Sequence, residues 1–376
     1  MNQKTKNSTL CSPSLVERGQ GGEALLQSLV RPNIWTLKPY SSARDEFSGS
    51  DGIFLDANEN PFGSLNRYPD PYQRELKKVL SEIKNIPQNH ICIGNGSDEI
   101  IDLVYRIFAN PGKDSVIICP PTYGMYEVSA RINDVNIVEI PLIDDFDYTS
   151  LRRTLFQLDT AAIQQKTQDD PSIKLIFICS PNNPTGNCLK NVDQVIENFN
   201  GIVVIDEAYI DFCDDKTHLS AIKKHPNLIV MQTFSKALAL AGVRVGVAYS
   251  QPDIIGLMNK VKPPYNVSKL NQEVALQALL KRLEKKTDID NILEEKKFLF
   301  EQLEQLPMVK KIYPSDANFL LVEVDDADYT YNYLVEKKVI VRNRHSQIEN
   351  CIRITIGTPD ENRQLLNELQ HISDVC

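Results

Sequence analysis

The chain has 376 residues, of which 42% are hydrophobic and 24% charged, and its formal net charge is −9. This length suits one large domain with a smaller one, and the acidic balance argues against a general nucleic-acid binder. The sequence contains no apolar run long enough to cross a membrane and no signal-peptide core. We therefore expect a cytoplasmic protein that binds neither nucleic acid nor membrane.

Eight cysteines are present, and no two of them are spaced as C-x-x-C. Several lie in apolar, strand-like runs, which favours buried thiols in a reducing compartment over disulfides. The five histidines lack the spacing of metal ligands, so we predict no metal site.

The N-terminal region changes character near Ala24. Residues 1–24 are polar and rich in serine and glycine, which predicts a disordered leader or an upstream start site. A short helix over Leu25–Val30 is expected next, followed by an extended segment with an exposed aromatic residue, Tyr40. We assign residues 25–60 to an N-terminal arm that joins the small domain.

Short apolar runs then alternate with helical stretches as far as Tyr249. Continuous apolar strands with helices between them predict a mainly parallel sheet that helices cover on both faces. Ligands of such sheets bind at the carboxyl ends of the strands. We assign residues 61–265 to this large domain. The predicted strands are His90–Ile93, Val116–Cys119, Asn136–Ile140, Leu175–Cys179, Ile202–Ile205 and Leu228–Met231.

The last part of the chain predicts a second, smaller α/β domain. A long charged helical region spans about Lys269 to Leu306, and a terminal helix closes the chain. Three strand-like runs lie between them, at Asn318–Val324, Val339–Arg342 and Cys351–Thr355. Residues 266–376 therefore form an interdomain helix and a small C-terminal domain.

One lysine stands out at a predicted strand end. Lys236 follows Ser235 shortly after the run Leu228–Met231, and Arg244 comes eight positions later. Such a lysine can form an imine with pyridoxal phosphate, while the hydroxyl and the guanidinium suit the phosphate. By itself the pattern also fits an exposed lysine at a strand-to-loop junction.

Other candidate groups also follow predicted strands. Gly96, Ser97 and Asp98 open a helix, and a helix N-terminus binds anions through free N–H groups and the helix dipole. An ordinary Ser-capped helix is the alternative. Tyr123 suits stacking on a flat ring, or it fills the core as many tyrosines do.

Two further strand ends complete the predicted cofactor site. Asn183 lies in a turn between two prolines and suits donation to a phenolate oxygen, although any polar turn looks similar. Asp206 ends an apolar strand, where a carboxylate needs a partner such as a protonated pyridine nitrogen; a helix cap or a metal ligand is the alternative. Tyr209 suits donation to the same ring oxygen as Asn183. Together these groups predict a pyridoxal-phosphate site.

With these residues in hand, the chain closely resembles the fold-type-I pyridoxal-phosphate aminotransferases, and within them the histidinol-phosphate aminotransferases, from about Ser28 to the C-terminus. The resemblance implies a seven-stranded sheet in the large domain and the cofactor bound as an imine to Lys236. It rests on the segments Leu55–Pro61, Tyr68–Asp70, Gly96–Glu99, Ser180–Gly186, Asp206–Tyr209, Thr233–Lys236 and Arg353–Gly357.

The resemblance also implies a homodimer whose active sites lie at the subunit interface. In such a dimer Tyr68 reaches the cofactor phosphate of the partner subunit. Guanidinium groups on the small domain would clamp a phosphate or carboxylate. A solvated strand end is the alternative for Arg342 and Arg344, and we expect it for Arg344 rather than for Arg342. The residues implied to contact the substrate are Tyr40, Asn58, Arg342 and Arg353.

The reaction implied by the resemblance is transamination of L-histidinol phosphate with 2-oxoglutarate, which gives imidazole-acetol phosphate and glutamate in histidine biosynthesis. Lys236 would first hold the cofactor and then act as the base. A threonine-phosphate decarboxylase and an aromatic-amino-acid aminotransferase remain alternatives, since both keep this lysine. A non-catalytic cofactor-binding regulator is a third, although no helix-turn-helix appendage is present.

Overall fold

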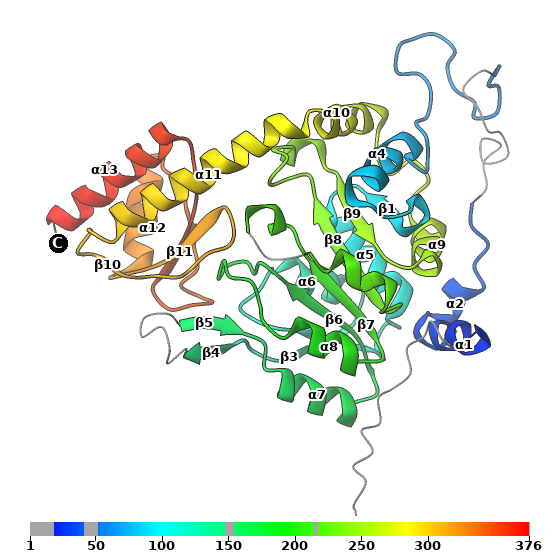
Figure 1. Cartoon of the computed structure of the whole chain (residues 1–376), viewed down its shortest axis with the longest axis horizontal. Coiled ribbons are helices and arrows are strands. Elements are labelled where there is room, and N and C mark those ends of the chain that lie inside the picture. Colours follow the sequence, from blue (N-terminus) through cyan, green and yellow to red (C-terminus); the bar gives the residue numbers. More distant parts are fainter. Residues whose placement is uncertain (1–18, 41–51, 147–153, 214–216, 376) are drawn as a thin grey trace, which may run out of the picture.

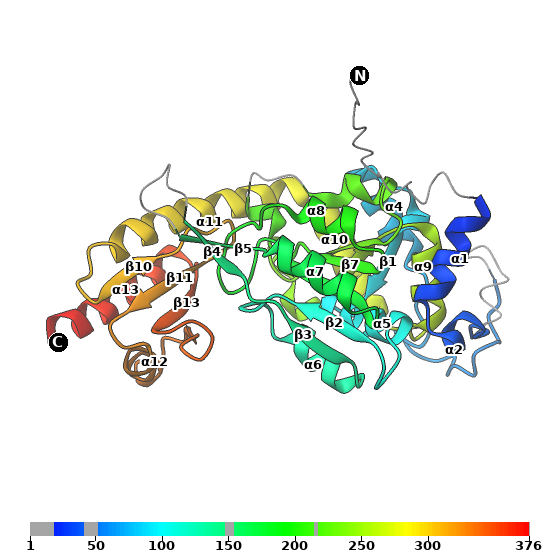
Figure 2. The same ribbon diagram turned by 90° about the horizontal axis from the view of Figure 1, so that it is seen from below.

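The computed structural model describes residues 19–40, 52–146, 154–213 and 217–375 (Figure 1). The predicted leader up to residue 18 lies outside these ranges. A large domain occupies the middle of the molecule, and the long helix α11 (Arg282–Leu303) leads from it to a smaller C-terminal domain at one end (Figure 2). Within the described ranges, no helix combines the length and apolar character needed to span a membrane.

The large domain is built on a seven-stranded sheet with the order β1-β9-β8-β7-β6-β2-β3. The strands from β8 to β3 in this order run parallel, whereas β9 is antiparallel to both β1 and β8. The predicted mainly parallel sheet is therefore confirmed. The strands are β1 (Ile91–Gly94), β2 (Ser115–Ile118), β3 (Asn136–Glu139), β6 (Ile173–Cys179), β7 (Ile202–Asp206), β8 (Leu228–Thr233) and β9 (Gly246–Tyr249).

Helices cover both faces of this sheet because its strands carry apolar side chains on both sides. In β8, Leu228 and Val230 belong to one core, while Ile229 and Met231 belong to the other. Helices α4, α7, α8 and α10 close the first core, and α5, α6 and α9 close the second. Their bounds are α4 (Arg74–Lys84), α5 (Ser97–Phe108), α6 (Met125–Ile132), α7 (Thr160–Asp169), α8 (Val192–Asn198), α9 (Pro252–Val261) and α10 (Lys269–Leu280).

The small domain contains a four-stranded antiparallel sheet with the order β10-β11-β13-β12. Helices α11, α12 and α13 pack on it around a separate apolar core. The predicted strand over Val339–Arg342 is largely wrong, since only Arg342 and Asn343 pair in this region. The elements are β10 (Val309–Ile312), β11 (Phe319–Val324), α12 (Ala327–Glu336), β12 (Arg342–Asn343), β13 (Cys351–Thr355) and α13 (Pro359–Val375).

Three features of the chain escaped prediction. The charged helical region divides at Lys281 into α10 and α11 instead of forming one helix. Strand β10 was missed because its Val-Lys-Lys-Ile sequence is not a continuous apolar run. The antiparallel hairpin of β4 (Ile143–Phe146) and β5 (Thr154–Gln157) has no turn signal of the kind that marks a short hairpin.

The described part of the N-terminal region contacts the large domain. Helix α1 (Gly19–Leu29) begins inside the predicted leader, and α2 (Pro32–Trp35) follows it. Val30 and Ile34 pack in the core that contains α5 and α9, although the sequence placed this arm with the small domain. The boundaries of the domains stay a prediction.

We expect the aromatic stack in the second core to be a main source of stability. Phe177 in β6 is 1% exposed, and its ring lies 5.2 Å from that of Tyr105 and 4.9 Å from that of Tyr126. Phe177→Ala should lower the free energy of unfolding by about 3–5 kcal/mol in urea denaturation, because it leaves a cavity. The exposed Val128→Ala is the control and should change it by less than about 0.5 kcal/mol. A loss below about 1 kcal/mol for Phe177→Ala would contradict this role.

Candidate active site

A cavity of about 410 Å³ opens at the carboxyl ends of the strands of the large sheet. Its walls come from the segments that follow β1, β2, β6, β7 and β8, and from the small domain. Parallel strands end at the same edge of a sheet, so segments far apart in the sequence meet here. The cavity brings together many of the predicted site residues: Ser97, Asp98, Tyr123, Asn183, Asp206, Tyr209, Ser235, Lys236, Arg244, Arg342 and Arg353.

Asp206 is the last residue of β7, and only 3% of its surface is exposed. The Tyr126 hydroxyl donates to its Oδ2 at 2.8 Å, and the Ala208 N–H donates to its Oδ1 at 3.1 Å. Burial raises the pKa of Asp206 to about 6, although both hydrogen bonds favour the charged form. A cation beside this carboxylate would keep it ionised.

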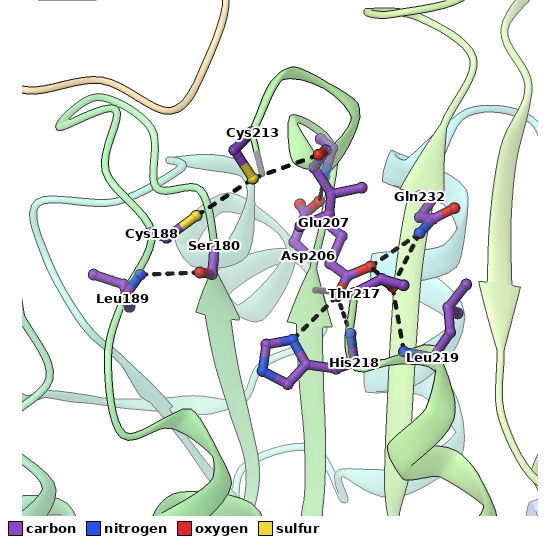
Figure 3. A network of polar contacts seen from close by, with 12 residues as sticks. Ser180, Cys188, Leu189, Asp206, Glu207, Cys213, Thr217, His218, Leu219 and Gln232 are labelled. Atoms are coloured by element: carbon purple, nitrogen blue, oxygen red, sulfur yellow. Dashed lines mark hydrogen bonds and ion pairs between the residues drawn. The ribbon is translucent and has the colours of Figure 1, made fainter. Parts of the chain in front are cut away.

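The neighbouring carboxylate of Glu207 has a different role, because it is buried and bonded on all sides (Figure 3). It accepts from the Thr217 hydroxyl at 2.5 Å, from the His218 N–H at 2.6 Å and from Gln232 Nε2 at 2.9 Å. Gln232 belongs to β8, so this network ties the ends of β7 and β8 together. This network therefore fixes the position of Asp206 relative to the segment that leads to Lys236.

Lys236 lies just past the end of β8 and faces the same cavity. Its Nζ is 5.6 Å from the centroid of the Tyr209 ring. Burial, and next the charge of Arg353, lower the pKa of Lys236. A lysine with a lowered pKa is more often neutral, as a nucleophile or base must be.

Asn183 and Tyr209 form a pair on one wall of the cavity. Asn183 Nδ2 donates to the Tyr209 hydroxyl at 3.4 Å, and Arg353 from the small domain donates to Asn183 Oδ1. The Tyr209 ring packs edge-on against Phe319 at 5.2 Å. Burial raises the pKa of Tyr209, so its hydroxyl remains a proton donor.

The opposite end of the cavity suits an anion. Ser97 opens α5 after Gly96, whose φ is +80°, and a Cβ at Gly96 would lie 2.6 Å from the Arg244 guanidinium. Arg244 pairs with Asp98 at 3.1 Å, and the Tyr123 hydroxyl donates to the same carboxylate at 3.1 Å. The cavity lining thus combines the N-terminus of α5, whose first N–H groups have no partner within the helix, with a guanidinium and the Ser235 hydroxyl.

Three arginines from the small domain line the cavity: Arg342, Arg344 and Arg353. Arg342 of β12 and Arg353 of β13 lie opposite each other in the antiparallel pair of these two strands. Burial, and next the charges of Arg353 and Arg342, lower the pKa of Arg344 to about 10. The buried Nε atoms of Arg344 and Arg353 have no hydrogen-bond partner among the described residues. Such a cluster calls for an anionic ligand.

The solvated strand end predicted for Arg344 is wrong, because Arg344 lines the cavity. It is half-buried, whereas Arg342 is the exposed member of the pair. Tyr126 was also missed as a site residue, although it follows Tyr123 by three positions in the same motif. In both cases the sequence carries the residue but not the direction of its side chain.

Of the predicted site residues absent from the cavity lining, Gly96 adjoins it at Arg244, and three others lie away from it. Asn58 and Tyr68 line a separate hollow of about 480 Å³, in which the Tyr68 ring stacks on Tyr265 at 4.4 Å. Tyr40 is 70% exposed and lines neither space. Within one chain, these side chains are therefore not brought to Lys236.

The sequence model of the aminotransferases of class I and II matches residues 51–369. The histidinol-phosphate aminotransferase of Cytophaga hutchinsonii is 50% identical over 354 residues, which are 92% of this chain and 98% of that protein. The chain belongs to the histidinol-phosphate aminotransferases, within the class I and II aminotransferases.

Solved structures agree with this family on the fold. The histidinol-phosphate aminotransferase of Clostridium acetobutylicum has a TM-score of 0.73 at 23% identity and covers 83% of this chain and 92% of its own. That of Sinorhizobium meliloti, solved in complex with pyridoxal 5′-phosphate, has a TM-score of 0.73 at 20% identity and covers 98% of both chains.

The residues present in this aminotransferase fit pyridoxal phosphate. A buried carboxylate whose pKa has risen to about 6 suits a protonated ring nitrogen. The amide–phenol pair of Asn183 and Tyr209 suits a ring oxygen. The start of α5 with Arg244 suits a phosphate.

We expect Asp206 to make the cofactor-free protein less stable as the pH rises. Its pKa is raised in the folded state, so the stability present at low pH is lost as the pH rises through about 6. Asp206→Asn should therefore be more stable than the unaltered protein by up to ~3 kcal/mol at about pH 8, with a much smaller difference near pH 4.5, in urea denaturation.

Asp360→Asn is the matched control, because the Asp360 side chain is 99% exposed. This exposed substitution should change the free energy of unfolding by less than about 0.5 kcal/mol at both pH values. Parallel stability profiles for Asp206→Asn and the unaltered protein would contradict the raised pKa.

Proposed function

We propose that the protein transfers the amino group of L-histidinol phosphate to 2-oxoglutarate, as a pyridoxal-phosphate enzyme of histidine biosynthesis. The observation that carries this proposal is the cluster of Arg342, Arg344 and Arg353 in one cavity with Lys236. A phosphorylated amine and a dicarboxylate are both anions that such a cluster can bind. Membership of the histidinol-phosphate aminotransferases supports the choice of substrate. A location in the cytoplasm stays a prediction from the sequence.

In this proposal the cofactor supplies an electron sink next to the carbon that carries the substrate's amino group. Lys236 would hold the cofactor covalently. With its amine released, Lys236 would accept the proton from that carbon. Its lowered pKa supports this role, because only the neutral amine can take a proton.

Asp206 and the pair of Asn183 and Tyr209 would hold the cofactor ring from two sides. Asp206 would pair with the ring nitrogen and keep it protonated, which preserves the electron sink. Tyr209 would donate to the ring oxygen, and its raised pKa keeps the phenol protonated for this task. Tyr126 would orient Asp206 through its 2.8 Å hydrogen bond, and Tyr123 would cover the ring face.

The cofactor phosphate would lie at the start of α5. Backbone N–H groups of Ser97 and its neighbours, the Ser235 hydroxyl and the Arg244 guanidinium would bind it. Asp98 keeps Arg244 oriented through their 3.1 Å ion pair. Gly96 leaves room for the guanidinium, since any side chain there would collide with it.

The substrate anion would lie against the small domain. Arg353 donates to Asn183, so it couples the substrate side of the cavity to the ring-oxygen side. Arg342 and Arg344 flank it and would bind the substrate phosphate. Both half-reactions use the same anion site, because 2-oxoglutarate places a carboxylate where histidinol phosphate places its phosphate.

We further propose a homodimer in which each active site receives Tyr68 from the partner subunit. The segment around Tyr68 supports this, because it exposes large apolar side chains that a partner surface would cover. Ile53 is 91% exposed, Leu55 87% and Phe62 84%. Tyr40 and Asn58 likewise lie outside the cavity of their own chain. In the proposed dimer they would also act across the interface.

A half-reaction screen tests the activity. The yellow protein, mixed separately with histidinol phosphate, phosphothreonine, phenylalanine and glutamate, should lose its cofactor absorbance with histidinol phosphate and glutamate. Carbon dioxide release from phosphothreonine would favour a decarboxylase, and bleaching by phenylalanine alone would favour an aromatic-amino-acid aminotransferase.

Lys236→Ala should lower turnover by at least about 10³-fold, because it removes both the covalent attachment of the cofactor and the base.

Mixed dimers test the shared site. Lys236→Ala and Tyr68→Ala subunits should each be nearly inactive alone. After unfolding and refolding together, the mixed dimer should regain activity, because one of its sites combines an intact Lys236 with an intact Tyr68 from the other subunit. Light scattering would report the dimer, and mixtures that stay as inactive as their parents would contradict a site shared between subunits.

A further inference from the structure

Two thiols from different segments lie side by side next to the active-site strands (Figure 3). The Sγ atoms of Cys188 and Cys213 are 3.6 Å apart. Cys188 follows the loop that carries Asn183, and Cys213 ends the short turn Ile210–Phe212 that follows Tyr209. A disulfide needs its sulfurs at ~2.05 Å, so the two must approach by roughly 1.5 Å.

These two thiols differ from the other cysteines that the structure describes. Both are half-buried, whereas Cys92, Cys119, Cys179 and Cys351 are buried. Burial also raises the pKa of Cys119 and of Cys351 to about 12, which leaves those groups as unreactive thiols. A small reagent can therefore reach this pair in preference to the buried cysteines.

Charges around the pair make its two members unequal. Lys296 of α11 donates through its Nζ to the carbonyls of Ser315 and Ala317 at 2.9 and 3.0 Å, and burial lowers its pKa while the charges of Asp316 and, next, Cys213 raise it. An ammonium beside a thiol favours the thiolate, which is the nucleophile. Cys188 instead lies beside a carboxylate, because its N–H donates to Asp316 Oδ2 at 2.7 Å. Cys213 is thus the better attacking group.

We propose that Cys188 and Cys213 form a redox-active dithiol, which low-molecular-weight disulfides convert reversibly into an intramolecular disulfide that lowers turnover. The Cys213 thiolate attacks one sulfur of the reagent, whose S–S bond breaks and releases one thiol. Cys188 then loses its proton and attacks the Cys213 sulfur, which releases the second thiol. The protein loses two hydrogens and two electrons, and the reagent gains both.

The new bond would join the two segments that position the ring-oxygen donors. Cys188 comes five residues after Asn183, and Cys213 comes four residues after Tyr209. The Asn183 and Tyr209 side chains are in contact at 3.4 Å. Moving such groups by about 1 Å costs a catalytic site a factor of ten or more. This part of the inference rests on the proposed aminotransferase activity.

The test uses the full-length holoprotein with Cys11→Ser and Cys376→Ser, since those two thiols lie outside the described residues. Oxidised glutathione is the probe. Intact mass should show the loss of two hydrogens, and peptide mapping should show a Cys188–Cys213 cross-link. Turnover should fall about tenfold or more and return with dithiothreitol.

Single variants test the order of attack. In the same background, Cys188→Ser should accumulate one glutathione on Cys213, because the resolving thiol is missing. Cys213→Ser should react much more slowly and keep its turnover. Lys296→Met should slow the modification about tenfold, and Lys296→Arg should restore the rate, because it keeps the charge.

The outcomes separate the parts of the proposal. Absence of the cross-link in the parent protein overturns it, and glutathione trapped on Cys188 reverses the assigned order of attack. A cross-link with unchanged turnover overturns the effect on activity. If the untreated protein has no transaminase activity, the proposed function fails, while mass and mapping still decide whether the dithiol exists.

Discussion

A carboxylate buried at the carboxyl end of β7 is the constraint on which the rest of the site depends. The Asp206 carboxylate accepts hydrogen bonds from the Tyr126 phenol and the Ala208 N–H, and burial raises its pKa to about 6. An ionised group in this position needs a cation, and the cavity in front of it offers room for a ring that carries one. The lysine and the anion-binding groups line the same space.

The small domain contributes lining residues to this site and also contacts the loop that carries Asn183. Arg353 crosses to Asn183, and the Asp316 N–H donates to the Gly186 carbonyl at 2.7 Å. Gly186 has a φ of +87°, and a Cβ there would lie 2.6 Å from Ser315 Oγ, so the two domains approach too closely for a side chain. The loop that carries Asn183 is therefore held in place by the domain that carries Arg342, Arg344 and Arg353.

Further contacts join the segments that lie around the Asn183 loop. Glu207 ties β7 to β8 on one side of Asp206, and the Cys188–Cys213 contact joins the following segments on the other. Lys296 of α11, the helix that leads from one domain to the other, donates to the carbonyls on both sides of Asp316, and Asp316 accepts from the Cys188 N–H. The geometry of Asn183 and Tyr209 thus depends on groups that do not line the cavity.

The amino-acid sequence by itself determined the sheet class and the groups at the strand ends, because both follow from local patterns. Continuous apolar runs require burial on two faces; Asp206 stands directly after such a run, and Lys236 stands five residues after the end of another. It did not reveal that β9 runs antiparallel or that Arg344 turns inward. Those features, like the position of Tyr126 under Asp206 and the meeting of Cys188 with Cys213, join residues far apart in the chain. Only the tertiary packing decides which way such side chains point, since no local pattern encodes a contact across that distance.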